Sequence, residues 1–275
     1  MPFAFHFSSY FIALSLSLIN PDWPARPAWA QTQSASNPST SPEINELATA
    51  LAGAASEEEQ ERLLARKNAL MNSSLLAALK SLADPLVHKG DYAQALRISQ
   101  IAARIAERIG DRGRLGNALI DLGRIHYRQN HHAQALDCFQ KGLAIFEETG
   151  DKKGKSLALL NIGSTYDSQK RFDQALNYYE KSLAISEETG DKRVTARILY
   201  NMGATHDALE HYEFALELYL KSRALSEEVN DRETLNSVLN NIATTYIDYG
   251  RYAEALREAT NASHREARTG SSEQP

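Results

Sequence analysis

The sequence holds one cysteine, Cys138, among 275 residues. An intramolecular disulfide is therefore excluded, and stability must come from packing. An excess of positive charge is also missing, since 30 Lys and Arg face 35 Asp and Glu for a formal net charge of -5. This balance gives no electrostatic footprint for nucleic acid or for an anionic membrane. With 43% hydrophobic and 24% charged residues, the composition is nevertheless that of a folded globular chain.

The motifs of common enzyme and metal sites are missing too. The histidines and Cys138 show no zinc-ligand spacing, because His131-His132 are adjacent and neither H-x-x-x-H nor C-x-x-C occurs. Gly154 to Ser156 resembles part of a phosphate loop, but Thr149 stands where that loop needs glycine. G-x-S-x-G is absent as well. The sequence therefore predicts no enzyme, no metal site and no cofactor.

The N-terminus has the pattern of an export signal. The apolar run Phe11 to Ile19 is too short to span a bilayer comfortably. Ala28-Trp29-Ala30 fits a small-x-small cleavage pattern, and polar residues come directly after it. We expect residues 1–30 to be removed after Ala30, giving an exported (periplasmic or secreted) protein with no membrane segment. Because residues 1–10 lack Lys and Arg, an uncleaved N-terminal membrane anchor and a different start codon are the alternatives.

Two segments separate this signal from the rest of the chain. Residues 31–42 are rich in Ser, Thr, Asn, Gln and Pro without apolar periodicity, which predicts a disordered linker. Residues 43–74 are helical by pattern. Ser56 is a helix N-cap, and the three glutamates after it suit the helix dipole. Leu63, Leu64 and Leu70 give these helices an apolar face, so we expect them to cap the structure formed by the rest of the chain.

Residues 75–270 form an internal repeat. An Ala-Leu pair returns every forty residues, at Ala95-Leu96, Ala135-Leu136, Ala175-Leu176, Ala215-Leu216 and Ala255-Leu256. A fixed period of this size marks a solenoid of stacked units. In the third copy Leu159, Ile162, Gly163 and Tyr166 fall on one face of a first helix. The inner face of a second helix would hold Ala175, Leu176, Tyr179, Ser182 and Leu183. Each unit is therefore predicted to be a helix hairpin.

The residues between the helices agree with this period. The second helices end on residues suited to a left-handed cap, namely Gly110, Gly150, Gly190, Asn230 and Gly270. Aspartates come next as N-caps of the following unit, at Asp111, Asp151, Asp191 and Asp231. The predicted fold is an all-α, right-handed α-solenoid of about five helix hairpins with an N-terminal helical cap. Its repeats are 75–110, 115–150, 155–190, 195–230 and 235–270, and residues 271–275 form a disordered tail.

Three local features of the array carry expectations of their own. Pro85 lies inside the first helix of the first copy, where it would remove a hydrogen bond and kink or split the helix. In the last helix Ser263 and Arg265 replace apolar residues, as a terminal repeat requires. Two acidic pairs end second helices, and we interpret them as a solvated ridge. The alternative is pairing with basic residues across the next turn, Glu147-Glu148 with Lys152-Lys153 and Glu187-Glu188 with Lys192-Arg193.

The repeat resembles the tetratricopeptide repeat, in the forty-residue variety found in kinesin light chain. The family pattern maps onto Leu159, Ile162-Gly163, Tyr166, Ala175, Tyr179 and Ser182, although Leu replaces the usual Trp at the first position. This resemblance covers about residues 75–270. It implies a non-catalytic scaffold or adaptor that binds a protein or peptide partner. A regulatory or sensory subunit of a separately encoded enzyme and a self-associating structural array are the alternatives.

The resemblance also indicates where a partner would bind. In tetratricopeptide repeats the first helices line a concave groove, and an Asn just before the Leu-Gly pair contacts the bound peptide. A carboxamide both donates and accepts, which suits the backbone of an extended peptide. The implied groove residues are Asp121, Asn161, Asn201, Asn241, Arg124, Arg197, Tyr200 and Asn240, with Asn117 and Thr244 beside them. The alternative is that the asparagines bond between adjacent helices and hold no ligand.

Overall fold

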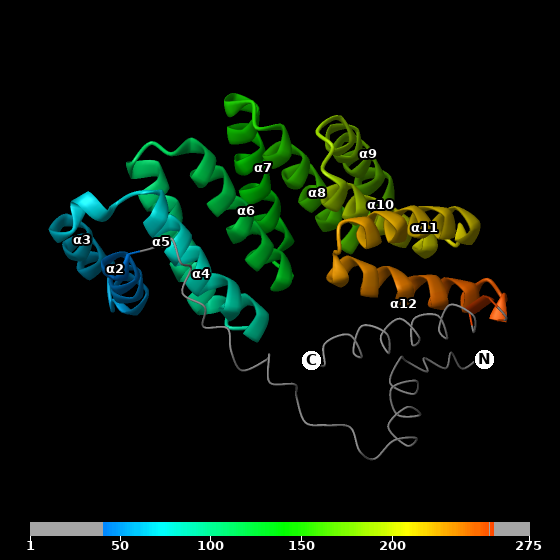
Figure 1. The fold of residues 1–275 in the computed structure, drawn as a ribbon, viewed down its shortest axis with the longest axis horizontal. Helices are drawn as coiled ribbons and strands as arrows, with labels where there is room; N and C mark the ends of the chain where they lie inside the picture. The colour runs from blue at the N-terminus through cyan, green and yellow to red at the C-terminus, as the bar shows by residue number, and fades with distance from the viewer. Residues whose placement is uncertain (1–40, 253, 256–275) are drawn as a thin grey trace, which may run out of the picture. The chain divides into compact units, whose positions relative to one another are not determined.

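The computed structural model describes residues 41–252 and 254–255, and these residues form helices joined by short turns (Figure 1). The predicted signal peptide, nearly all of the linker, most of the last helix and the tail lie outside the described residues. The helices are α2 (Pro42–Gly53), α3 (Glu57–Arg66), the short 3-10 helix η2 (Asn68–Leu70), α4 (Ser73–Lys89), α5 (Tyr92–Arg108), α6 (Arg112–Arg128), α7 (His132–Thr149), α8 (Lys152–Ser168), α9 (Phe172–Glu188), α10 (Lys192–Ala208), α11 (Tyr212–Glu228) and α12 (Arg232–Asp248). Among them, no helix is both long and apolar enough to cross a membrane.

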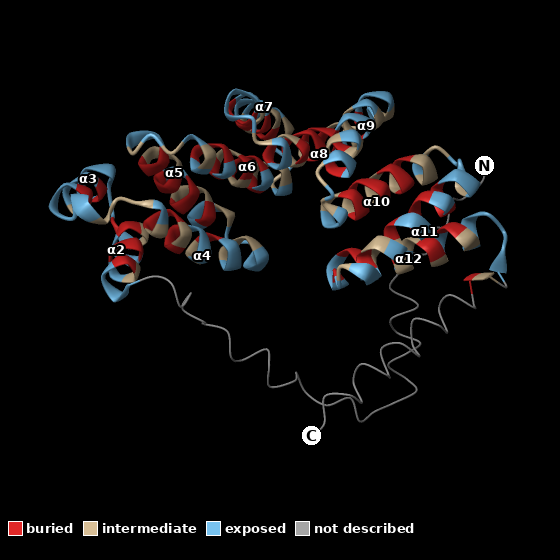
Figure 2. Cartoon of the chain, turned by 45° about the horizontal axis from the view of Figure 1, so that its top comes forward, coloured by how far each residue is buried: buried red, intermediate tan, exposed pale blue. Residues whose placement is uncertain are grey.

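Consecutive helices pack as hairpins, and the hairpins stack on one another. The four described hairpins are α4–α5, α6–α7, α8–α9 and α10–α11, and α12 begins the fifth. Each first helix also contacts the first helix of the next hairpin. For example, α6 contacts α8, and α8 contacts α10. Figure 2 shows the buried residues on the helix sides that face a neighbour. The prediction of an all-α solenoid is confirmed.

The caps between repeats form as the sequence indicates. Asp111, Asp151, Asp191 and Asp231 each accept a hydrogen bond from the backbone N–H three residues on, at 3.0 to 3.3 Å. Left-handed φ angles of 72°, 69°, 66° and 53° occur at Gly110, Gly150, Gly190 and Asn230. Within the repeats, left-handed residues also form the turns between the two helices, at Asn130, Lys170 and Glu210.

In the second, third and fourth repeats, close helix contact depends on a glycine in the first helix and a ring in the second helix. A Cβ added to Gly163 would lie 2.6 Å from the Tyr179 ring. The same juxtaposition joins Gly123 to Phe139 and Gly203 to Tyr219, and all three rings are buried. The ring therefore occupies the space that a side chain on the first helix would need.

The N-terminal helices pack on the first repeat. Ser56 Oγ accepts from the backbone N–H of Glu59 at 3.2 Å, which confirms the predicted N-cap of α3. Helix α2 contacts α4 and α5, and Leu47, Leu51 and Leu64 share one apolar cluster with residues of the first repeat. Helix α2 begins at Pro42, inside the segment predicted as linker, because Ser41 caps it.

From the sequence, Pro85 is expected to kink or split the first helix, and the split does not occur. Helix α4 runs unbroken from Ser73 to Lys89 with Pro85 inside it. Proline removes the hydrogen bond to the carbonyl four residues earlier, that of Ser81. Both Ser81 and Pro85 are exposed, so water can satisfy this carbonyl.

The alternative pairing of the acidic residues across the turn is wrong in its partners. Arg112, Lys152 and Lys192 begin first helices, and each pairs with the glutamate near the end of the second helix of its own repeat, namely Glu148, Glu188 and Glu228. Glu147 pairs with Lys155 at 2.8 Å. The two ends of one hairpin lie side by side, which brings these residues together. Such exposed pairs stabilise the fold weakly.

Candidate peptide-binding groove

The predicted polar row lies on successive first helices. Asp121 is on α6, Asn161 on α8, Asn201 on α10 and Asn241 on α12, and all four are half-buried. The forty-residue period repeats the same helix register in each unit, which explains the alignment. The structure therefore brings these side chains into equivalent positions on neighbouring helices.

The three asparagines make different hydrogen bonds. Asn201 Nδ2 donates to Ser164 Oγ at 3.0 Å, and Asn241 Nδ2 donates to the Tyr219 hydroxyl at 3.1 Å. Both bonds join neighbouring helices, as the alternative interpretation of the row expects. Asn161 Nδ2 instead donates to the Leu157 carbonyl of its own helix at 2.8 Å. A carboxamide has a second N–H and an acceptor oxygen, so these bonds leave each Asn able to contact a ligand.

Asp121 belongs to an ion-pair network instead. Lys80 Nζ lies 2.7 Å from one Asp121 oxygen and 3.1 Å from Asp84, while Arg124 lies 3.5 Å from the other Asp121 oxygen. Burial lowers the pKa of Lys80, but the Asp121 and Asp84 carboxylates together raise it by more, so the pKa of Lys80 is raised. The bond from Lys80 to Asp121 therefore joins α4 to α6.

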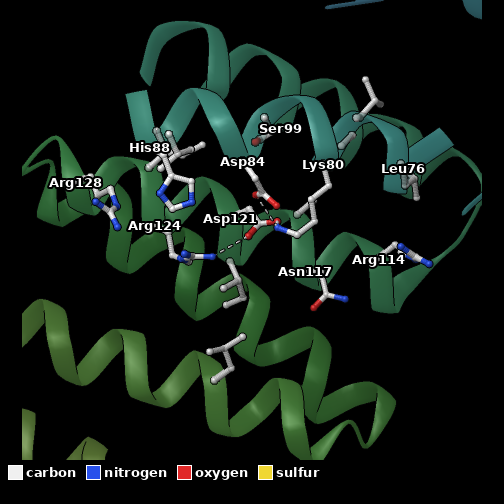
Figure 3. Close-up of a pocket in the computed structure, with 18 residues that line it drawn as sticks. Leu76, Lys80, Asp84, His88, Ser99, Arg114, Asn117, Asp121, Arg124 and Arg128 are labelled. Carbon is white, nitrogen blue, oxygen red and sulfur yellow. Dashed lines mark hydrogen bonds and ion pairs between the residues drawn. The ribbon is translucent and has the colours of Figure 1, made fainter. Parts of the chain in front are cut away.

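The predicted residues line two neighbouring cavities. The first, of about 450 Å³, lies between α4 and α6 and holds Asn117, Asp121 and Arg124 (Figure 3). The second, of about 530 Å³, spans α6 to α12. Its predicted members are Arg124, Asn161, Arg197, Tyr200 and Asn201. Arg124 lines both cavities, so the two are adjacent along the first helices. Asn240, Asn241 and Thr244 lie on α12 and line neither cavity.

Arg197 lies in the second cavity among charged groups that shift its pKa. Burial, followed by the like charge of Arg124, lowers the pKa of Arg197. Asp231 and Glu233, which line the same cavity, act in the opposite direction. An anionic group placed between Arg124 and Arg197 would stabilise both guanidinium ions. The cavity therefore has the chemistry to hold a carboxylate beside the Asn161 and Asn201 carboxamides.

Several groove residues were not predicted. Arg128 and Arg193 line the second cavity, and Lys80 lines the first. The signal for the two arginines was present, because each is four residues from a predicted arginine on the same helix and so shares its face. Ser164, which receives the Asn201 bond, carries no comparable signal.

The cysteine is not part of either cavity. Cys138 is half-buried on α7. Burial, followed by the Asp137 charge, raises the pKa of its thiol, so it lacks the thiolate character of a nucleophile. In the part of the chain that the structure describes, no three His, Cys, Asp or Glu side chains gather as a metal site would require.

The tetratricopeptide repeat family model matches residues 74–148 and 155–228, which together exceed half of the chain. The chain therefore belongs to the tetratricopeptide repeat family. No curated protein matches it.

Solved structures share the fold at low sequence identity. BtubC (BKLC) from P. vanneervenii is similar with a TM-score of 0.65 and 17% identity, over 82% of this chain and 91% of that one. A Rap protein complexed with Competence and Sporulation Factor is similar with a TM-score of 0.62 and 14% identity, over 74% and 57%. Kinesin light chain TPR-like repeats from Podosopora anserina are similar with a TM-score of 0.55 and 15% identity, over 70% of this chain and 96% of that one. The predicted resemblance to kinesin light chain repeats is confirmed.

Proposed function

We propose that this chain is a non-catalytic adaptor that binds an extended segment of a protein partner along its first helices. The observation that carries the proposal is the cavity in which Arg124 and Arg197 lie beside the Asn161 and Asn201 carboxamides. Carboxamides match the alternating donors and acceptors of an extended backbone, and the arginines match a carboxylate on the segment. The Rap proteins that share the fold support this proposal, since two of them were solved with Competence and Sporulation Factor and with the Phr* peptide.

The test is selection of peptides from a random displayed library on the full chain, followed by calorimetry of the enriched sequences. We expect Arg197→Glu to weaken their binding by about tenfold or more, because it places a carboxylate where the peptide's anionic group would lie. Lys141→Glu makes the same charge reversal on the exposed face of α7 and should leave affinity unchanged. Failure to enrich any peptide, or equal binding by the Arg197 variant, would contradict the proposal.

We also propose that residues 1–30 direct export and are then removed. The short apolar run and the Ala28-Trp29-Ala30 pattern support this. Mass analysis of the exported form should give Gln31 as its first residue. An intact Met1 in that form would rule out cleavage.

A further inference from the structure

One column of the repeat differs in the first copy. In the second, third and fourth repeats this column holds Phe139, Tyr179 and Tyr219, each at most 1% exposed. Each ring lies over a glycine of the paired first helix. The equivalent residue of the first repeat is Ser99. The first repeat therefore has no ring of its own at this position.

The cavity between α4 and α6 lies where that ring would be. Ser99 lines this cavity, and so does Ala83, which replaces the paired glycine. Apolar side chains supply much of the remaining wall, among them Leu76, Leu79, Val87, Ile120 and Ile125. Its volume of about 450 Å³ falls in the range of ligand pockets. Ligand pockets commonly combine an apolar wall of this kind with a few polar groups that orient the ligand.

The equivalent ring of Tyr219 indicates which groove residue a ring in this cavity would meet. The Tyr219 hydroxyl accepts a hydrogen bond from Asn241, the groove residue of the next first helix, 22 residues further along the chain. Asp121 lies at the same spacing after Ser99, and Asp121 lines the cavity. Figure 3 shows Lys80, Asp84, Asp121 and Arg124 gathered at this place. A carboxylate can only accept hydrogen bonds, so it complements a ring that carries a donor at its tip.

We propose that this cavity binds a tyrosine side chain of the partner peptide, with the ring beside Ser99 and the phenol O–H donating to Asp121. The proposal rests on the proposed function, because the ring belongs to the segment that the groove holds. The ring lies in trans beside the place that Tyr179 and Tyr219 fill in their own repeats, shifted away from the Ala83 Cβ. The polar group at its tip meets the same row of groove residues that contacts the rest of the peptide.

Small amino-acid amides test the cavity without knowledge of the partner. N-acetyl-tyrosinamide, N-acetyl-phenylalaninamide and N-acetyl-leucinamide are titrated into the full chain, and binding is followed by NMR. The tyrosine probe should bind about tenfold more tightly than the phenylalanine probe, because its hydroxyl reaches a charged acceptor. The leucine probe should bind more weakly than either. Equal binding of all three probes would overturn the proposal.

Two variants locate the binding. Ser99→Phe places a ring in the cavity beside Ala83, so probe binding should be lost. Because Ala83 carries a Cβ where the second repeat has Gly123, this ring is crowded and the melting temperature should fall by a few degrees. Gln94→Phe adds the same ring at an exposed position of α5 and should not affect the probes. Asp121→Ala should keep the phenylalanine probe and remove the preference for tyrosine, because alanine cannot accept the phenol hydrogen bond. If Ser99→Phe does not fold, unchanged tyrosine preference in Asp121→Ala still overturns the proposal.

Peptides selected on the groove separate this inference from the proposed function. Enriched peptides should carry a tyrosine, and Ser99→Phe should weaken them by about tenfold or more. Equal binding of those peptides by wild type and Ser99→Phe would overturn the tyrosine site while the adaptor function stands. A different result would contradict the adaptor function alone. In that case no peptide is enriched, but the tyrosine and phenylalanine probes still bind the wild-type chain and do not bind Ser99→Phe.

Discussion

At the scale of single residues, one column of the repeat serves two purposes. Asn241 donates to the hydroxyl of Tyr219, a fully buried ring, so its carboxamide helps to join α11 and α12. Asn161 bonds to a carbonyl of its own helix and lines the groove cavity. The same residue type in the same register is therefore structural in one repeat and available to a ligand in another.

Two alanine variants separate these roles. Asn241→Ala removes the partner of the Tyr219 hydroxyl and should lower the free energy of unfolding by about 1 kcal/mol. Asn161→Ala removes a bond within a single helix, so we expect little change in stability and weaker binding of groove peptides. Denaturant unfolding and calorimetry on both variants provide the comparison. A large loss of stability in Asn161→Ala would show that this residue, too, joins elements of the fold.

At the scale of helices, a glycine in the first helix sets the distance between the two helices of the second, third and fourth hairpins. An added Cβ on Gly163 meets the Tyr179 ring at 2.6 Å and the Ala175 carbonyl oxygen at 3.2 Å. The ring is buried at 1% exposure and the carbonyl belongs to the backbone of α9, so neither can move away easily. Since the first helices also carry the groove residues, this contact fixes where the groove residues of one repeat lie relative to its second helix.

Gly163→Ala should therefore destabilise the chain by about 1 to 3 kcal/mol through overpacking. Gly113→Ala is the matched control, because Gly113 is also helical and its added Cβ would meet nothing closer than 3.8 Å. There the higher helix propensity of alanine should stabilise by up to about 1 kcal/mol. Thermal unfolding of the two variants gives changes of opposite sign. Two stabilised variants would contradict the packing argument.

At the scale of the whole described array, the sequence predicted the structural features that recur with the forty-residue period. The helix pairs, the aspartate caps and the left-handed glycines recur every forty residues, so each copy supports the others. Features that depend on a single copy were missed. Lys170 and Glu210 adopt left-handed φ angles of 59° and 62°. Neither residue type predicts a left-handed backbone conformation in the way that glycine or asparagine does. The consequence of Ser99 was missed for the same reason, because a small residue in one copy becomes a cavity when the neighbouring helices are in place.

Two equivalent histidine pairs lie at the same turn of two repeats. The rings of His126 and His131 have centroids 6.1 Å apart, and those of His206 and His211 are 5.7 Å apart. Burial, followed by the charge of the neighbouring histidine, lowers the pKa of His126 and of His206. The Glu180 carboxylate opposes the shift at His206 without reversing it.

Because a lowered pKa means that the folded state binds protons less readily than the unfolded state, these histidines make stability depend on pH. Stability should be constant above about pH 7, and it should fall as the pH drops through the unfolded-state value of about 6.5. Melting temperatures measured between about pH 7.5 and 5.5 should show this decline. The double variant His126→Gln with His206→Gln should flatten it. Burial raises the pKa of Asp167 and Asp207, so these two groups act with the opposite sign. A melting temperature that is independent of pH over this range in the wild-type chain would contradict the histidine assignment.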